Sequence, residues 1–235
     1  MKHDFVFFDL DNTLLDHSAA EKSAHGAIHS LFEELRQVDT DQWLATYKAI
    51  NTRLWLEYQK GETDRHTLQK TRFRESMEKL GIDTRRSEQI GKRYMEVYRD
   101  YWGWIEGAEE ALMRVAEQYP VGFITNGFLE TQQRKIDFLN LKRFSSIFII
   151  SEEVGVMKPH PKVFDLATEK ADTSRKRIVY VGDSYSSDIV GGRNAGWSTA
   201  WYTAYTSVVS SGQTADFSFD QFPDLVGYLI PESTK

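Results

Sequence analysis

Residues 5–13 read FVFFDLDNT, and this stretch decides how the fold begins. Its first four residues are apolar and rich in β-forming types, and the carboxylates of Asp9 and Asp11 follow abruptly. A short, continuously apolar run is typical of a strand buried on both faces of a parallel sheet. Asp9 would then stand at the carboxyl end of the strand, where ligands bind in open α/β sheets.

Four further apolar runs of similar length follow along the chain. They are Val121–Thr125, Ile147–Ile150, Ile178–Val181 and Thr199–Tyr202. From residue 105 onward, helical patterns separate them. These cover Ala108–Gln118, Leu129–Leu139, Pro161–Lys170 and Ser186–Asn194. The alternation of strands and helices predicts an α/β fold with a doubly wound, Rossmann-like parallel sheet.

The chain between the first two strands has a different pattern. Its apolar residues recur at helical spacing in four groups, which predicts four amphipathic helices without a strand. We therefore expect an α/β core formed by residues 1–16 and 105–235, with an all-helical cap inserted over residues 17–104. Because this insert leaves the sheet at the carboxyl end of the first strand, it is placed to cover a site there.

The composition excludes several classes of function. The chain has 235 residues and no cysteine, so a thiol nucleophile, a thiolate metal site and disulfides are excluded. A net charge of −6 argues against a nucleic-acid polymer as the main partner. The sequence has neither a signal-like segment nor an apolar run long enough for a membrane span, so we expect no membrane association and a cytoplasmic location. A monomer is the default.

Polar residues follow the predicted strands at their carboxyl ends. They are Asp9, Asp11 and Thr13 after the first strand, Thr125, Asn126 and Gly127 at the second, Lys158 after the third, and Asp183 and Asp188 after the fourth. The carboxyl ends of parallel strands meet at one edge of a sheet, so these side chains could come together.

The paired carboxylates Asp9 and Asp11 are two residues apart, which puts both on one face of an extended chain. Beside Asp183 they would repel each other unless a cation intervened, and oxygen ligands suit Mg²⁺. Taken singly, each motif has another interpretation. Asp9–Asp11 could be a polar turn or a sugar-nucleotide site, and residues 182–184 an ordinary helix cap.

Together and in this order, the motifs resemble the phosphatase branch of the haloacid dehalogenase superfamily. Its pattern is D-x-D-x-T, then T/S-N, then K-P, then G-D-S-x-x-x-D, with a helical cap after the first motif. All four motifs match here. The resemblance implies that Asp9 is the nucleophile and forms an aspartyl-phosphate. It also implies that Asp11 is the general acid and base.

The same resemblance implies the remaining roles. Mg²⁺ would be held by the carboxylates of Asp9 and Asp183 and by the backbone carbonyl of Asp11. The phosphate would be bound by Thr125, the amides of Asn126 and Gly127, and Lys158. Thr13 would position the loop, and Asp188 would orient Lys158 or a metal-bound water. Because the true dehalogenases of this superfamily lack the second aspartate, Asp11 argues against dehalogenation.

Two histidines lie near these motifs. The family usually has an acidic residue after Lys158-Pro159, whereas this chain has His160, for which helix capping is favoured over metal binding. His17 stands at the entrance to the insert and could contact substrate.

The substrate is indicated by residues 125–128 (TNGF), the pair Gln132-Gln133 and residues 151–155 (SEEVG). They resemble the nucleoside 5′-monophosphatase subgroup, which often prefers pyrimidine nucleotides. An aromatic ring of the insert could stack on a base, although aromatics at helical spacing usually form core. A phosphatase of sugar or glycolate phosphates, a phosphomutase and a non-catalytic binding protein are the alternatives.

Overall fold

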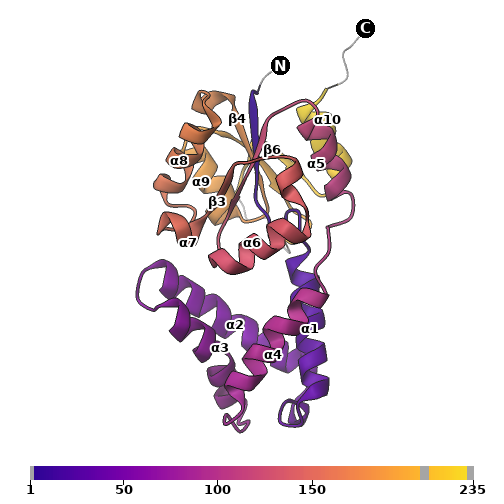
Figure 1. Ribbon diagram of the computed structural model, residues 1–235, viewed down its shortest axis with the longest axis vertical. Coiled ribbons are helices and arrows are strands. Elements are labelled where there is room, and N and C mark those ends of the chain that lie inside the picture. The colour runs from indigo at the N-terminus through magenta and orange to yellow at the C-terminus, as the bar shows by residue number, and fades with distance from the viewer. Residues whose placement is uncertain (1–2, 207–211, 232–235) are drawn as a thin grey trace. The chain divides into compact units, whose positions relative to one another are not determined.

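The computed structural model describes residues 3–206 and 212–231. The chain forms two compact units, both visible in Figure 1. The core unit comprises the described residues up to Asp16 and from Gly103 on, and the helical unit comprises His17–Trp102. Within the described residues, no helix combines the length and the hydropathy that crossing a membrane requires.

The core unit is built on one parallel sheet. Its strands are β1 (Phe5–Phe8), β2 (Val121–Thr125), β3 (Phe148–Ile150), β4 (Ile178–Gly182), β5 (Ser198–Tyr202) and β6 (Phe217–Phe219). They are arranged in the order β3-β2-β1-β4-β5-β6, and every neighbouring pair is parallel. This arrangement confirms the predicted doubly wound α/β fold. It also places β1, which carries Asp9 at its end, in the middle of the sheet.

Helices cover both faces of this sheet. They are α5 (Ala108–Ala116), α6 (Leu129–Phe138), α7 (Ser151–Val154), α8 (Pro161–Ala171), α9 (Val190–Asn194) and α10 (Phe222–Leu229). In Figure 1, α5 and α10 lie on one side of the sheet and α8 and α9 on the other. The ring of Phe7 stacks on that of Trp197 at 5.2 Å, and Phe164 meets Trp197 edge-on at 5.3 Å. This aromatic packing holds β1 against α8.

The structure adds elements that the sequence pattern did not predict. Strand β6 and helix α10 both follow the last predicted strand. Asp188 lies in a π-helical turn, Tyr185–Ile189, rather than in a continuous α-helix from residue 186. Gly103 and Trp104 belong to the core unit, where Gly103 accepts a hydrogen bond from the Asp16 amide at 3.0 Å.

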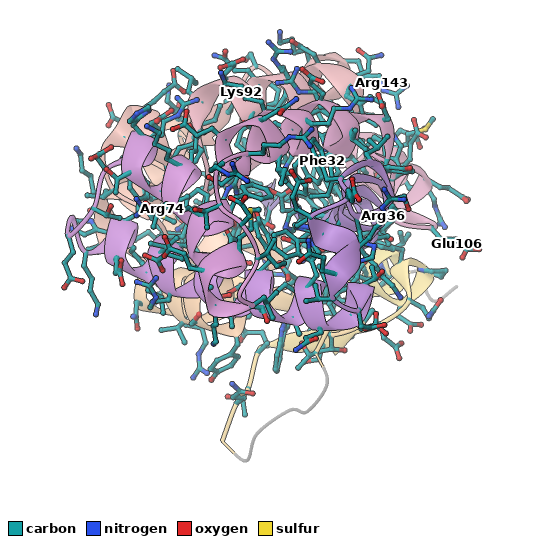
Figure 2. The ribbon with its side chains drawn as sticks, turned by 90° about the horizontal axis from the view of Figure 1, so that it is seen from below. Phe32, Arg36, Arg74, Lys92, Glu106 and Arg143 are labelled. Carbon is teal, nitrogen blue, oxygen red and sulfur yellow. The ribbon has the colours of Figure 1, made fainter. Side chains whose placement is uncertain are left out.

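The helical unit contains four α-helices. They are α1 (His17–Leu31), α2 (Thr40–Gln59), α3 (Arg65–Lys79) and α4 (Ser87–Asp100). Asp39 caps α2 by accepting hydrogen bonds from two backbone amides, and Asp64 caps α3 in the same way with one. The polar faces of α3 and α4 carry exposed charges, such as Arg74 and Lys92 at the surface in Figure 2.

An aromatic cluster fills the interior of the helical unit. It consists of His25, Trp43, Tyr47, Phe73 and Tyr94, all of them buried. Nε1 of Trp43 donates to Nδ1 of His25 at 3.0 Å, and the rings of His25 and Tyr47 are 4.1 Å apart. These rings therefore form the core of the helical unit.

Lowering the pH below 6.5 is expected to destabilise the protein through His25. Burial, followed by the charge of Arg72, holds the pKa of His25 well below its ordinary value of 6.5. The unfolded chain therefore binds a proton at a pH where folded His25 stays neutral. The free energy of unfolding should fall by up to about 1.4 kcal/mol per pH unit below the unfolded pKa.

Urea unfolding at several pH values, followed by tryptophan fluorescence, would measure this dependence in the wild type and in His25→Gln. The variant should lose this part of the pH dependence. Equal slopes in the two proteins would show that His25 contributes nothing.

Candidate active site

The carboxyl ends of β1, β2 and β4 lie together because the strands pair in register. Phe8, the last residue of β1, is paired with Phe123 of β2 and Val181 of β4. Asp9 follows at once, and its backbone N–H donates to the carbonyl oxygen of Val181 at 2.9 Å. Strand pairing thus fixes the backbone position of Asp9.

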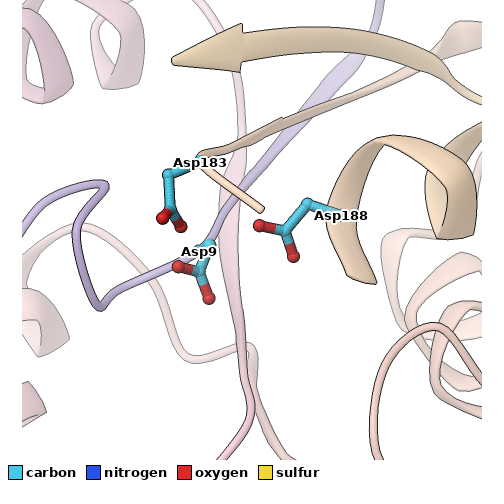
Figure 3. A group of neighbouring side chains, drawn as sticks. All are labelled: Asp9, Asp183 and Asp188. Atoms are coloured by element: carbon cyan, nitrogen blue, oxygen red, sulfur yellow. The ribbon is translucent and has the colours of Figure 1, made fainter. Parts of the chain in front are cut away.

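Three carboxylates converge at this edge, as Figure 3 shows. Asp9, Asp183 and Asp188 each offer an oxygen atom, and these three oxygens lie within 4.8 Å of one another. The amide of Ser184 donates to Oδ2 of Asp188 at 3.0 Å and fixes that carboxylate. A Cβ atom at position 182 would lie 2.5 Å from the same oxygen, so Gly182 is what lets Asp188 approach the strand end.

Lys158 lies between two of these carboxylates. Its Nζ is 2.6 Å from Oδ1 of Asp9 and 2.8 Å from Oδ1 of Asp188. It also donates to the Tyr180 hydroxyl at 2.7 Å and to the Ile124 carbonyl at 3.1 Å. Burial acts to lower the pKa of Lys158, but Asp188 and Asp9 outweigh it and the pKa is raised. Lys158 is therefore a buried, charged ammonium with its hydrogen bonds satisfied.

The carboxylate cluster keeps an excess of negative charge when all its members are ionised. Asp9, Asp183 and Asp188 then carry three negative charges against the one positive charge of Lys158, so the net charge is −2. Burial raises the pKa of Asp9 to about 7, even though the charge of Lys158 opposes the shift. Burial, and then the charge of Asp9, raises the pKa of Asp183 well above 3.8. A divalent cation would supply the missing positive charge, and carboxylate oxygens are ligands that Mg²⁺ prefers. The residues present fit such an ion.

Thr13 and Asn126 support this arrangement. The Thr13 hydroxyl donates to Oδ2 of Asp9 at 3.3 Å and lies 3.5 Å from Oδ1 of Asp183. The Asn126 side chain brackets the backbone of Lys158, because its Nδ2 donates to the Lys158 carbonyl at 3.1 Å and its Oδ1 accepts from the Lys158 amide at 2.8 Å. Thr125 is buried at the end of β2. All three lie at the predicted edge of the sheet.

The backbone amide of Gly127 has a partner of its own. It donates to Oγ of Ser151 at 3.0 Å in a buried hydrogen bond. The structure therefore uses this amide to connect β2 with the start of α7. The phosphate-binding role assigned to Gly127 from the sequence stays a prediction.

Asp11 has two partners that sequence reasoning missed. Nζ of Lys135 is 2.6 Å from Oδ1 of Asp11, and Nε2 of Gln132 donates to Oδ2 at 3.0 Å. Both partners come from α6 and are buried. Their spacing of three residues puts them on one helix face, and a lysine on a buried face is the signal that could have revealed them.

The two histidines singled out from the sequence have local partners. Nδ1 of His160 accepts from the Lys162 amide at 3.2 Å, which makes His160 the N-cap of α8 as the favoured interpretation expects. His17 Nδ1 lies 2.6 Å from the Tyr98 hydroxyl within the helical unit.

The comparisons with known proteins identify the family of this chain. A family model described as haloacid dehalogenase-like hydrolase matches residues 3–196. The chain therefore belongs to the haloacid dehalogenase-like hydrolases and is an enzyme of that class.

Its relatives include proteins named as phosphatases or nucleotidases. The chain is 33% identical to the pyrimidine 5′-nucleotidase YjjG of Escherichia coli (strain K12) over 206 residues, which cover 87% of this chain and 88% of the relative. It is 30% identical to the glyceraldehyde 3-phosphate phosphatase of Pyrococcus furiosus over 235 residues, covering 97% and 93%. Among solved structures, the magnesium-bound putative HAD-hydrolase YfnB from Bacillus subtilis matches with a TM-score of 0.82 and 25% identity, covering 98% of this chain and all of that one.

Proposed function

We propose that this enzyme is a Mg²⁺-dependent phosphomonoesterase that forms an aspartyl-phosphate on Asp9, and that its substrates are pyrimidine nucleoside 5′-monophosphates. The observation that carries this proposal is the position of Asp9. Its carboxylate is buried, contacts Lys158, and belongs to the cluster with Asp183 and Asp188. A nucleophile in this setting can attack phosphorus without a partner base once it is ionised.

The chemistry follows from the side chains at the edge of the sheet. An oxygen of Asp9 attacks the phosphorus atom, and the bond between phosphorus and the ester oxygen breaks. Asp11 gives its proton to the departing oxygen. Asp11 then takes a proton from the water that attacks the aspartyl-phosphate, and phosphate leaves with Asp9 restored. Throughout, Lys158 places a positive charge beside the phosphoryl oxygens, together with the hydroxyl of Thr125 and the amide of Asn126.

The carboxylates of Asp9 and Asp183 and the backbone carbonyl of Asp11 would hold the metal. Bound there, Mg²⁺ would offset the repulsion between a carboxylate nucleophile and a phosphate dianion, and it would favour the ionised form of Asp9, whose pKa burial raises to about 7. Asp188 would act indirectly, by orienting Lys158, since Oδ1 of Asp188 lies 2.8 Å from Nζ of Lys158.

The nucleotide specificity rests on the relatives and on the helical unit. YjjG and PynA, the latter from Streptococcus pneumoniae, are both named pyrimidine 5′-nucleotidases. Within the helical unit, Trp55 and Tyr58 are half-buried and pack edge-on at 5.7 Å, in contrast to the buried aromatic cluster. An aromatic side chain that keeps part of its surface accessible can stack on a base.

The glyceraldehyde 3-phosphate phosphatase from Pyrococcus furiosus favours a second candidate, because its similarity extends over 97% of this chain. A small sugar or triose phosphate would bind to the same catalytic residues. The two candidates differ in what the helical unit must recognise, which is a base in one case and a short polyol in the other.

A phosphate-release assay distinguishes these candidates and tests the metal. The panel consists of uridine, thymidine and adenosine 5′-monophosphates, glyceraldehyde 3-phosphate, phosphoglycolate and a sugar 1-phosphate, each with Mg²⁺ and with chelator. We expect pyrimidine nucleotides to exceed the non-nucleotide esters in kcat/KM by about tenfold or more, the equivalent of roughly 1.4 kcal/mol of selective contact. Chelator should abolish release, and Mg²⁺ should restore it.

Three outcomes would contradict the proposal. A higher kcat/KM for glyceraldehyde 3-phosphate or phosphoglycolate than for every nucleotide would refute the nucleotidase assignment. Activity that survives complete removal of divalent ions would refute the role of the metal. Transfer of phosphate to a second position of a sugar phosphate, without release to water, would instead indicate a mutase.

A further inference from the structure

Lys135 and Gln132, the two α6 side chains that contact Asp11, are both buried, which is unusual for these residue types. Lys135 has only 4% of its side chain exposed, and Gln132 is 2% exposed as a residue. Burial of a lysine is costly unless its charge is compensated, and Asp11 compensates it at 2.6 Å. The chain thus maintains a buried ion pair with the residue assigned to proton transfer.

The orientation of the Gln132 amide is determined by its neighbours. Its Nε2 lies 3.0 Å from Oδ2 of Asp11 and 2.8 Å from the carbonyl oxygen of Asn126. Both neighbours are acceptors, so the amide must present its N–H groups to them, and the flipped amide would bring three oxygens together. Gln132 therefore links Asp11 to the backbone at the end of β2.

Gly127 provides the space that this contact needs. Its φ of +150° is one that side chains rarely adopt, and a Cβ atom there would lie 2.4 Å from Nε2 of Gln132. A larger residue at 127 would push the Gln132 amide away from Asp11. The local backbone is thus adapted to let α6 reach the catalytic loop.

We propose that Lys135 and Gln132 are positioning residues that hold the Asp11 carboxyl group in place for proton transfer to the leaving oxygen. This inference rests on the proposed phosphatase function. Each carboxylate oxygen has two lone-pair positions, so an oxygen that accepts from α6 keeps one position for the transferred proton. The ion pair with Lys135 is the state of Asp11 without that proton. When the proton moves to the leaving oxygen, Asp11 returns to this anion, and the ammonium of Lys135 stabilises it.

The test uses two phosphate esters whose leaving groups differ in how strongly they require protonation. An alkyl phosphate, such as a nucleoside 5′-monophosphate, has a poor leaving group and requires Asp11 as acid. In 4-nitrophenyl phosphate the leaving group departs as a stable anion. Because kcat/KM reports the steps up to cleavage of the ester bond, the ratio of kcat/KM between the two esters isolates the protonation step.

We expect Lys135→Met to lower kcat/KM for the alkyl ester by about 100-fold, in line with the loss of general acid catalysis, and that for the aryl ester by only about threefold. Gln132→Leu should change the ratio in the same direction by a smaller factor. Lys135→Arg keeps the charge and should recover most of the alkyl-ester activity. In an Asp11→Asn background, Lys135→Met should no longer change the ratio, because the group that it positions is gone.

Lys142→Met is the matched control, since Lys142 is an exposed lysine of the core unit that pairs with Asp137. Equal losses on both esters in Lys135→Met, or a ratio change that persists with Asn at position 11, would overturn the inference and leave a purely structural role. The proposed function fails separately. In that case the wild type releases phosphate from neither ester, or Asp9→Asn hydrolyses both as fast as the wild type.

Discussion

Replacing Asp9 by Asn is expected to abolish phosphoester hydrolysis, with a loss of about 10⁴-fold or more in kcat. The amide has nearly the shape of the carboxylate but is not a nucleophile toward phosphorus. It also removes one of the charges that compensate Lys158, whose Nζ lies 2.6 Å from Oδ1 of Asp9. The measurement is phosphate release from 4-nitrophenyl phosphate and from uridine 5′-monophosphate with saturating Mg²⁺.

The control for this variant is Asp165→Asn. Asp165 is an exposed carboxylate of α8 that pairs with Arg175. It should retain wild-type kcat. Hydrolysis by Asp9→Asn within tenfold of the wild-type rate would rule out Asp9 as the nucleophile, because replacing a catalytic nucleophile lowers kcat by far more than tenfold.

Replacing Lys158 by Met is expected to affect both activity and stability. Methionine fills a similar volume without the charge, so Asp9 and Asp188 lose the ammonium that lies within 2.8 Å of both. Breaking a buried ion pair on one side typically costs about 3–5 kcal/mol of unfolding free energy. Loss of a group that stabilises transition-state charge should lower kcat by about 100- to 1,000-fold.

Urea unfolding monitored by circular dichroism, together with phosphate release, measures both effects. Lys162→Met is the control, because the Lys162 ammonium contacts the Val154 carbonyl instead of a carboxylate. We also expect Mg²⁺ to recover part of the lost stability of Lys158→Met by supplying positive charge to the same cluster. A Lys158→Met protein as stable and as active as the wild type would contradict the roles assigned to Lys158 in catalysis and in stability.

The sheet could be predicted because its first five strands are nearly continuously apolar. All four residues of β1 and all five of β2 are buried, and such runs leave little choice but a strand covered on both faces. Strand β6 could not be found in the same way. It has only three residues, and Ser218 in its middle is exposed, so it carries no periodic signal.

The site was predictable where it depends on strand ends and less so where it depends on helix orientation. Asp9 and Asp183 follow strands and Thr125 ends one, so the sheet register alone brings them to one edge. The contact of Asp188 with Lys158 depends on the π-helical turn after β4. The contact between Lys135 and Asp11 depends on how α6 packs. The two residues are 124 positions apart in the sequence and meet only through the tertiary fold.

The most direct test of the central claim is to trap the covalent intermediate. The enzyme is mixed with a pyrimidine nucleoside 5′-monophosphate and Mg²⁺, quenched in acid during turnover, digested and analysed by mass spectrometry. The proposed mechanism predicts phosphate on the peptide that contains Asp9 in the wild type, and none on that peptide in Asp9→Asn. Turnover without any phosphorylated peptide, or phosphate on a residue other than Asp9, would contradict it.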